Sequence, residues 1–467
     1  MKRTLLALLV TCVVFSARAE DILPVAVDNS KKEYFPPVFT QIGGSCAQAS
    51  IIGYVFTYEM NALLERSAST PENRFNYLFT WNFLNNGRDE GSFGWDGVLL
   101  SYKSGIMSDD DFPRQTLSTQ FRWASGYDKY YRAMHYKATA VLDIEVKNED
   151  EIRQLKEYLY NDGKGHLVSF SSAARGWVFN QYYSGPSETG YRCMLTGLPT
   201  EGAHAMSLVG YDDTVECTFD GRTTYGAFIA VNSYGDDYHD RGFFYLPYRF
   251  FLEPVPAGKI LSQSVYGVSV TYYEPRLVYK INVDYTSRND LSIIMGVADK
   301  PYSESPKVQV ESSIVKNQGG DFPMQGRSAP SEIELGLDAS PIADALASYE
   351  RPKFFLMINR RKMGQEGEGR LLGFEVYDYD TGKTYTFDEE CGPLQYGINM
   401  YGLATTPITT FSASRVAWLT PEGVPVAAPL VVRTAKGRYA KIRITRKGDE
   451  IAFKYVYAPN GSVHLGN

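Results

Sequence analysis

The sequence predicts a mixed α+β chain, with helices and strands in its first half and a β-rich second half. Apolar residues recur at three- and four-residue spacing from Ala47 to Glu65, which is typical of a helix. From Gly202 to Tyr211, small and apolar residues alternate as they do in buried strands. Beyond residue 268, short β-rich runs alternate with turns. At 467 residues the chain is long enough for two or more domains with cores of their own.

The N-terminal residues 1–19 predict a cleavable export signal. Two basic residues precede the apolar run LLALLVTCVVF, and the segment ends in Ala17-Arg18-Ala19. The apolar run is too short for a good membrane helix. We therefore expect an exported protein that is secreted, periplasmic or on the cell surface. Lipidation at Cys12 ranks second.

Removal of this signal makes the chain more acidic. Residues 1–19 contain three basic residues and no acidic one, so the formal charge changes from −7 to −10. Such an acidic chain argues against nucleic acid as a partner.

Helices and strands are expected in the following order up to residue 160. The helix that starts near Cys46 is followed by an apolar-aromatic segment and a glycine-punctuated loop at 87–94. A helix at Trp95–Lys103, ending near Gly105, precedes a strand at Ala138–Val146. The next segment reads as a helix capped by Asn161-Asp162-Gly163. The ranges of the apolar-aromatic segment and of this last helix are Phe75–Leu84 and Glu149–Tyr160.

Strands dominate the rest of the mixed part. A polar, hairpin-like insert at 212–224, with a turn at Asp220-Gly221, separates two of these strands. The predicted strands are Leu167–Phe170, Gly202–Tyr211, Gly226–Val231 and Gly242–Leu246.

The remainder resembles a β-sandwich with one helical segment at Pro341–Ala347 and a loop at Val308–Ser331. Its strands are expected at Leu277–Val283, Leu291–Val297, Lys353–Ile358 and Arg370–Tyr377. Later strands are expected at Leu430–Arg433, Ala440–Ile444 and Ile451–Tyr457. The resulting division is a signal at 1–19, a mixed domain at 20–267, a β-sandwich-like domain at 268–412 and a small β-rich module at 413–467.

Four cysteines remain after signal cleavage, namely Cys46, Cys193, Cys217 and Cys391. So few cysteines in an exported chain do not indicate a disulfide scaffold. No CxxC or clustered His/Cys pattern indicates zinc, and we expect neither a metal nor a cofactor. Cys193 and Cys217 either pair with each other or stay free.

A candidate reactive cysteine lies at the end of the stretch Gln41-Ile42-Gly43-Gly44-Ser45-Cys46. A glycine-rich turn places Cys46 at the first turn of a helix, where the helix dipole and free N–H groups favour a thiolate. The sequence thus predicts a lowered pKa for this thiol. A buried, inert cysteine is the alternative.

A cysteine nucleophile needs a base and a group that orients the base. His204 lies on a predicted interior strand, and Asn232 ends the next apolar strand, so neighbouring strands of one sheet would bring them together. A histidine that merely fills the core is the alternative. His166 is a second candidate for the base, and His239 is given no role.

The sequence resembles the papain-like (C1-type) cysteine peptidases in the order of four residues. Gln41 stands for the family's oxyanion glutamine and Cys46 for its nucleophile. His204 stands for its base and Asn232 for the asparagine that orients the base. The segments at 91–106 and 155–170 are similar to further parts of that family. So is Asn232-Ser233-Tyr234-Gly235 with Gly242-Phe243-Phe244, although Tyr234 stands where the family has tryptophan. The resemblance covers about residues 34–255.

The resemblance implies a papain-like fold of two subdomains with the site between them, followed by β-sandwich-like domains. It implies peptide-bond hydrolysis of a peptide or protein substrate. The substrate groove would be lined by Gly91, Ser92, Gly94, Trp95 and Ala203. The alternatives are an acyl transferase or amidase with the same triad, and a non-catalytic protein whose β-rich domains bind a glycan or cell-surface partner.

Overall fold

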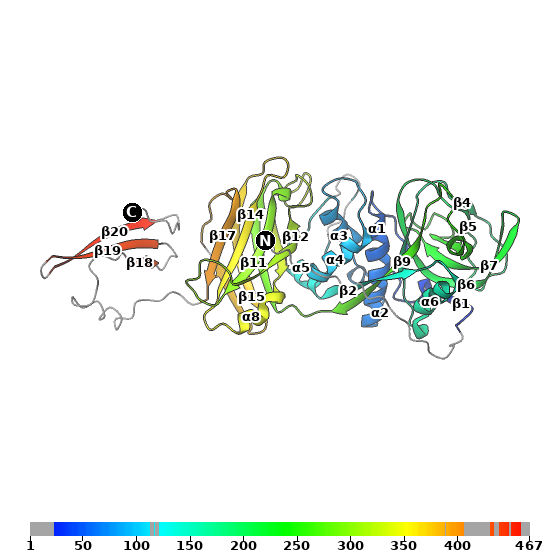
Figure 1. Cartoon of the computed structure of the whole chain (residues 1–467), viewed down its shortest axis with the longest axis horizontal. Coiled ribbons are helices and arrows are strands. Elements are labelled where there is room, and N and C mark those ends of the chain that lie inside the picture. The colour runs from blue at the N-terminus through cyan, green and yellow to red at the C-terminus, as the bar shows by residue number, and fades with distance from the viewer. Residues whose placement is uncertain are drawn as a thin grey trace. The chain divides into compact units, whose positions relative to one another are not determined.

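The computed structural model describes residues 23–112, 116, 121–387 and 389–405, and the strands at 430–433, 439–447 and 450–458. The predicted export signal at 1–19, with Cys12, lies outside the described residues. Helices and strands follow one another in the first half of the chain, and strands dominate after it (Figure 1). The predicted α+β class with a β-rich C-terminal part is confirmed.

The helical run that begins at Cys46 has three parts. A short α1 (Cys46–Gln48) leads into the π-helical η2 (Ala49–Phe56) and then into α2 (Thr57–Leu64). Every residue of η2 is buried, as expected for an apolar run without a polar face. Thr57 donates its hydroxyl to the Ile52 carbonyl oxygen at 3.2 Å. The predicted helix is confirmed, but the apolar spacing does not predict its π-helical middle.

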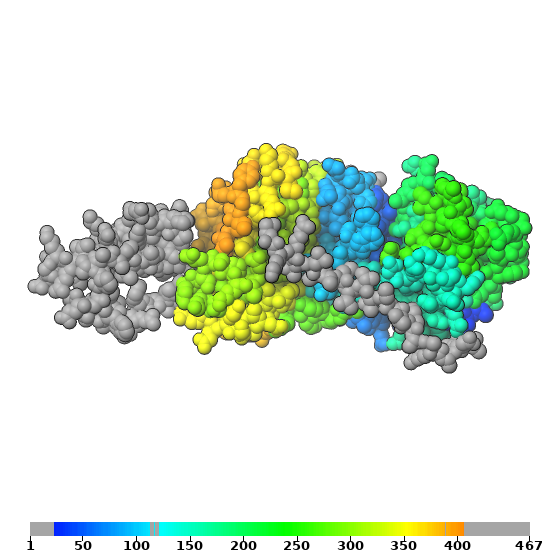
Figure 2. Space-filling view, viewed as in Figure 1, coloured from blue at the N-terminus to red at the C-terminus, as the bar shows by residue number. Residues whose placement is uncertain are grey.

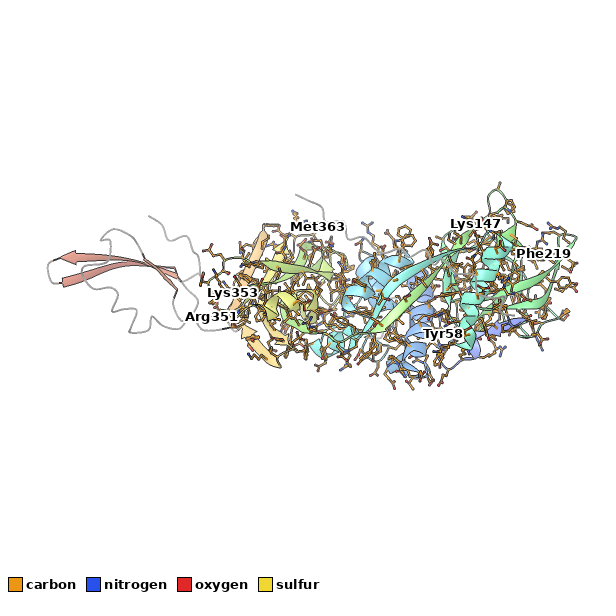
Figure 3. The ribbon with its side chains drawn as sticks, turned by 60° about the horizontal axis from the view of Figure 1, so that its bottom comes forward. Tyr58, Lys147, Phe219, Arg351, Lys353 and Met363 are labelled. Atoms are coloured by element: carbon orange, nitrogen blue, oxygen red, sulfur yellow. The ribbon has the colours of Figure 1, made fainter. Side chains whose placement is uncertain are left out.

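The other helices have local causes in the sequence. For example, two hydrogen bonds cap the first turn of α6 (Glu149–Tyr160). The Asn148 side chain accepts from the Glu151 backbone N–H, and the Glu151 carboxylate accepts from the Lys147 backbone N–H. On α2, Tyr58 is fully buried and donates to the Lys164 carbonyl oxygen at 3.0 Å (Figure 3). The helices are α3 (Tyr77–Leu84), α4 (Gly94–Ser104), α5 (Tyr127–Met134), α6 (Glu149–Tyr160), α7 (Arg249–Leu252) and α8 (Ala343–Ala347), with 3-10 turns η1 (Asn29–Lys31), η3 (Pro71–Asn73), η4 (Asn161–Gly163), η5 (Arg288–Asp290) and η6 (Ser340–Ile342).

A nine-stranded sheet carries the second half of the mixed part. Its order is β2-β9-β3-β6-β7-β8-β5-β4, with β1 paired to β6. Only the β5–β8 pair is parallel among the strand pairs described in this sheet. The strands are β1 (Ala26–Asp28), β2 (Tyr136–Glu145), β3 (Val168–Ser172), β4 (Val178–Asn180), β5 (Met194–Gly197), β6 (His204–Phe219), β7 (Arg222–Val231), β8 (Phe243–Pro247) and β9 (Leu261–Tyr272).

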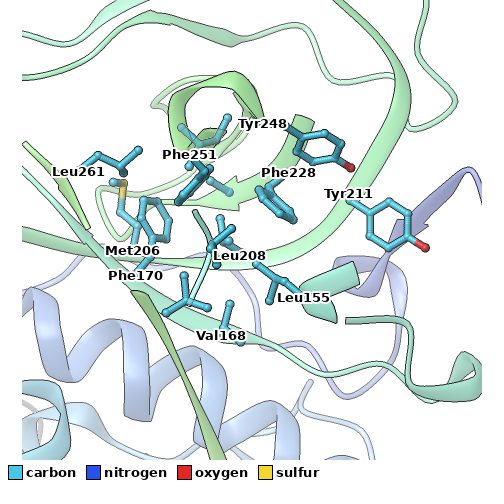
Figure 4. Packing of buried hydrophobic residues seen from close by; sticks show 14 of the residues in the cluster. Leu155, Val168, Phe170, Met206, Leu208, Tyr211, Phe228, Tyr248, Phe251 and Leu261 are labelled. Atoms are coloured by element: carbon cyan, nitrogen blue, oxygen red, sulfur yellow. The ribbon is translucent and has the colours of Figure 1, made fainter. Parts of the chain in front are cut away.

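The register of β6 against β7 places the candidate site. Ser207 lies opposite Val231 in this antiparallel pair, so the start of β6 and the end of β7 meet at the same edge. Behind them lies a hydrophobic core that includes Leu155, Phe170 and Phe228 (Figure 4). The helical residues, in blue, and the sheet residues, in green, lie side by side on one face (Figure 2).

Two four-stranded sheets follow, in the orders β13-β10-β15-β16 and β12-β11-β14-β17, and a three-stranded sheet has the order β18-β19-β20. The prediction of a loop throughout Val308–Ser331 was wrong for its first part, because β12 occupies Val308–Lys316. There, polar residues alternate with half-buried ones along an outer strand. The strands are β10 (Leu277–Tyr285), β11 (Leu291–Ala298), β12 (Val308–Lys316), β13 (Glu332–Asp338), β14 (Lys353–Arg360), β15 (Gly369–Asp378), β16 (Lys383–Phe387), β17 (Gly397–Ala404), β18 (Leu430–Arg433), β19 (Tyr439–Lys447) and β20 (Glu450–Ala458).

Compactness divides the described residues into two units. One lies within Met1–Ile294, Glu311–Ser340 and Ile358–Asn399, and the other within Met295–Val310, Pro341–Met357 and Met400–Asn467. The predicted boundary at 267/268 falls inside β9, which pairs with β2 as far as Tyr272. The domain limits given above stay a prediction. None of the helices in the described part of the chain has the length and apolar character needed to cross a membrane.

Candidate functional site

Cys46 is the first residue of α1 and is reached through a tight glycine turn. Gly43 has a φ of +56°, a left-handed conformation that favours glycine. A Cβ on Gly44 would lie 2.9 Å from the Glu90 carbonyl carbon, so only glycine allows the turn to approach the loop at 87–94 this closely. The Asp89 carboxylate accepts from the Gly44 amide at 2.6 Å and ties the two segments together.

The thiol of Cys46 is half-buried beside the start of β6. Burial raises its pKa, and the backbone N–H groups of Ala205, Ala47 and Cys46 itself offset only part of this rise. The direction is opposite to the lowered pKa expected from the sequence. A helix N-terminus does stabilise a thiolate, but here desolvation is the larger effect.

His204, the first residue of β6, is 4% exposed. Its Nε2 lies 2.9 Å from Oδ1 of Asn232. Tyr234 stacks on the imidazole at 4.7 Å between ring centroids, and Trp177 approaches it at 5.7 Å. Burial lowers the pKa of His204, while the bond to Asn232 acts in the opposite direction. The ring is therefore neutral at pH 7 and able to accept a proton.

Asn232 is fully buried just beyond the end of β7, and its neighbours fix the orientation of its amide. The Ser233 backbone N–H donates to Oδ1 at 2.8 Å. An NH₂ group cannot accept a hydrogen bond, so this atom is the oxygen. His204 Nε2 must then be the protonated nitrogen, which leaves Nδ1 with a free lone pair.

Gln41 is hydrogen-bonded to Ser233, the residue that follows Asn232. Its backbone N–H donates to the Ser233 carbonyl oxygen at 2.8 Å, and its Oε1 accepts from the Ser233 hydroxyl at 2.6 Å. Nε2 donates one hydrogen to the Gly43 carbonyl oxygen at 2.8 Å, which leaves a second amide hydrogen for a ligand. Ser233 therefore connects Gln41 to Asn232.

The predicted groove residues lie on one loop and beside the base. Gln48 of α1 donates to the Ser92 hydroxyl at 3.0 Å and to the Phe93 carbonyl oxygen at 2.9 Å, which fixes the loop to the nucleophile's helix. Trp95 is 39% exposed and stacks on Phe93, whose side chain is 62% exposed. The remaining predicted residues are Gly91 beside Gly44, Gly94 at the start of α4, and the exposed Ala203 next to His204.

The alternative base and the other cysteines are engaged elsewhere. His166 Nδ1 lies 2.7 Å from the Glu59 carboxylate, and its ring stacks on Tyr158. Cys193 and Cys217 are both buried and free, so the pairing considered for them is not formed. Within the described residues, no group of three or more His, Cys, Asp or Glu side chains is placed to hold a metal ion.

Sequence reasoning missed three residues of the site. Asp89 anchors the glycine turn, Trp177 lies against His204, and His239 contacts Asn232. The signal for His239 was present in its position, seven residues after Asn232 in the loop that leads to β8. Trp177 and Asp89 are brought to the site only by the fold.

No protein-family model and no curated protein matches the chain. Among solved structures it is similar to xylellain, a cysteine protease from Xylella fastidiosa, at 20% identity and a TM-score of 0.37, covering 53% of this chain and 87% of that one. The bromelain protease from Ananas comosus has 15% identity, a TM-score of 0.34 and coverages of 53% and 99%. The clostridial cysteine protease Cwp84 has 15% identity, a TM-score of 0.37 and coverages of 68% and 84%.

The solved structures named here are thus cysteine proteases, the kind of protein that the sequence resembles. The identities and TM-scores are low, however.

Proposed function

We propose that the chain is a cysteine peptidase that hydrolyses peptide bonds with Cys46 as nucleophile and His204 as base. The observation that carries the proposal is the His204–Asn232 contact of 2.9 Å beside the Cys46 thiol. It leaves the unprotonated nitrogen of a neutral, buried imidazole on the residue before Ala205, whose backbone N–H contacts the Cys46 thiol. The backbone N–H of Cys46 and the second Nε2 hydrogen of Gln41 are the proposed donors to the oxyanion.

In the first half of the reaction, Cys46 Sγ attacks the carbonyl carbon as its proton passes to His204 Nδ1. A carbon–sulfur bond forms, and the carbonyl π electrons move onto oxygen. The tetrahedral species then collapses, the carbon–nitrogen bond breaks, and His204 gives the proton to the leaving amine. Asn232 Oδ1 holds the imidazole in position throughout, because its bond to Nε2–H becomes stronger when the ring is charged.

In the second half, water attacks the thioester. His204 accepts a proton from the water, the carbon–sulfur bond breaks, and the proton returns to the sulfur. The product acid leaves and the free thiol is restored. The exposed Phe93 and Trp95 next to this position favour a peptide with apolar side chains.

An epoxide-type cysteine peptidase inhibitor tests the proposal directly. We expect one molecule of inhibitor per chain, attached to Cys46, because this half-buried thiol is the proposed nucleophile and His204 its proposed base. Peptide mapping by mass spectrometry identifies the modified residue. Labelling of Cys391, which is also half-exposed but lacks the histidine, would show general thiol reactivity instead.

The pH dependence of thiol alkylation tests the protonation state. The pKa of Cys46 is raised and that of His204 is lowered, so the thiolate fraction should be small at pH 7 and should increase only as the pH rises through the raised thiol pKa. We expect iodoacetamide to react about tenfold faster per pH unit up to beyond pH 9. A plateau between about pH 4 and 8 that disappears in His204→Ala would instead show a thiolate–imidazolium pair, as the sequence predicted.

Two further parts of the proposal rest on the sequence alone. The pattern at residues 1–19 supports export, and a glycan or cell-surface partner for the β-rich part stays a prediction. Acyl transfer uses the same thioester, so product analysis with an added amine nucleophile distinguishes it from hydrolysis.

A further inference from the structure

We propose that His239 is a positioning residue for the catalytic pair, acting through Asn232, so that the site is a chain of Cys46, His204, Asn232 and a second histidine. Nδ2 of Asn232 lies 3.3 Å from Nε2 of His239. This inference rests on the proposed function, since it assigns His239 to the same site.

The hydrogen bonds of Asn232 allow only one direction of donation. Oδ1 accepts from the Ser233 amide and from His204, so the group that faces His239 is the NH₂, a donor. His239 Nε2 must therefore accept and carry no hydrogen. A neutral His239 is then protonated on Nδ1, the nitrogen that lies 3.8 Å from Cys193 Sγ.

The contacts of Cys193, beyond His239, agree with this direction of hydrogen-bond donation. Cys193 is fully buried, and its thiol donates to Gln181 Oε1 at 3.3 Å, which leaves the sulfur to face His239 Nδ1–H as a weak acceptor. Burial keeps both groups in their neutral forms, since it lowers the pKa of His239 to about 4 and raises that of Cys193 to about 12. The neighbouring His204 also contributes to the low pKa of His239.

The loop holds His239 in place independently of its side chain. The backbone N–H of Asn232 donates to the Gly242 carbonyl oxygen at 3.0 Å. The backbone N–H of Gly242 donates to the Tyr238 carbonyl oxygen at 2.7 Å. His239 itself has a φ of 55°, which only such a closed loop makes tolerable for a bulky residue. Phe179 and Phe244 pack against the imidazole at 4.5 and 5.0 Å between ring centroids.

The consequence is that Asn232 cannot rotate its amide. Without an acceptor at His239, the buried Nδ2 would lose its partner, and a turn of the amide would present NH₂ to His204 Nε2–H. That arrangement removes the bond that keeps the base in its productive tautomer. His239 therefore reinforces the amide orientation that the Ser233 backbone N–H also holds and on which His204 depends.

Steady-state hydrolysis of a peptide by the full chain tests this with two variants. His239→Phe keeps a ring among Phe179 and Phe244 but removes the acceptor, and we expect kcat to fall roughly tenfold with KM within about twofold, as when a bond that orients a catalytic group is lost. His239→Gln keeps an acceptor near the position of Nε2 and should stay within about threefold of wild type. His135→Phe, a histidine-to-phenylalanine change outside the site, should leave kcat unchanged.

Two measurements separate positioning from a purely structural effect. Nitrogen-15 NMR of the imidazoles should show His239 in the less usual Nδ1–H form, whether or not the protein hydrolyses peptides. In an Asn232→Ala background, His239→Phe should change kcat by less than about twofold, because coupled residues are not additive. The inference is overturned if His239 carries its hydrogen on Nε2, if His239→Phe keeps wild-type kcat, or if the two effects add. If the wild type does not hydrolyse peptides, the proposed function is wrong. The His239 tautomer measured by NMR would still test the role of His239.

Discussion

Replacing Cys46 by alanine is expected to reduce peptide hydrolysis by at least about a thousandfold, because removal of a nucleophile that acts together with its base typically costs this much or more. Fold stability should be nearly unchanged. The side chain is half-buried, the variant removes a single sulfur atom, and alanine is a good helix former at the start of α1. Initial rates with a labelled unstructured peptide, together with thermal unfolding, measure both quantities.

The matched control is Cys391→Ala. This cysteine is also free and half-exposed, but its sulfur lies beside the Glu389 carbonyl oxygen and not beside a histidine. It should retain full activity. If Cys46→Ala keeps more than about a thousandth of the wild-type rate, covalent catalysis by Cys46 is wrong. The alternative of a non-catalytic binding protein would then be favoured.

The sequence was most informative where periodicity and turn chemistry agree. The helix from Glu149 to Tyr160 has the predicted limits, because Asn148 caps its start and Asn161 adopts a left-handed conformation at its end. The strand that carries His204 was predicted from its alternating small and apolar residues, and the strand before Asn232 is a short apolar run. The prediction failed for Val308–Lys316, because Ser312-Ser313 interrupt a short alternation of apolar and polar residues.

The site was predictable in outline and not in its electrostatics. The order of Gln41, Cys46, His204 and Asn232 in the sequence is enough to nominate them, and the register of β6 with β7 brings the last two together. The direction of the pKa shift of Cys46 depends on how many atoms surround the thiol, which local sequence does not reveal. His239 was missed because its role follows from which side of the Asn232 amide faces it.

A buried arginine in the β-rich part gives the largest expected effect on stability. Arg288 is fully buried, and its guanidinium donates to the Gly319 carbonyl oxygen at 2.6 and 2.8 Å and to the Phe121 carbonyl oxygen at 2.9 Å. Trp123 packs on the guanidinium at 4.2 Å. One side chain therefore satisfies carbonyl groups from two segments far apart in the sequence. Burial lowers its pKa to about 9, so the group is still charged at pH 7.

Arg288→Met should therefore destabilise the fold by on the order of 2–4 kcal/mol, and Arg288→Ala by more, because buried carbonyl groups lose their donors and alanine adds a cavity. Denaturant unfolding and hydrogen exchange of the Trp123 amide, which donates to Gln325, measure the loss globally and locally. Arg327→Met is the matched control. That arginine is exposed and lies over the rings of Phe121 and Phe322, so we expect a cost below about 1 kcal/mol. Equal stability of Arg288→Met and wild type would show that the carbonyl groups find other donors, and that Arg288 does not hold the two segments together.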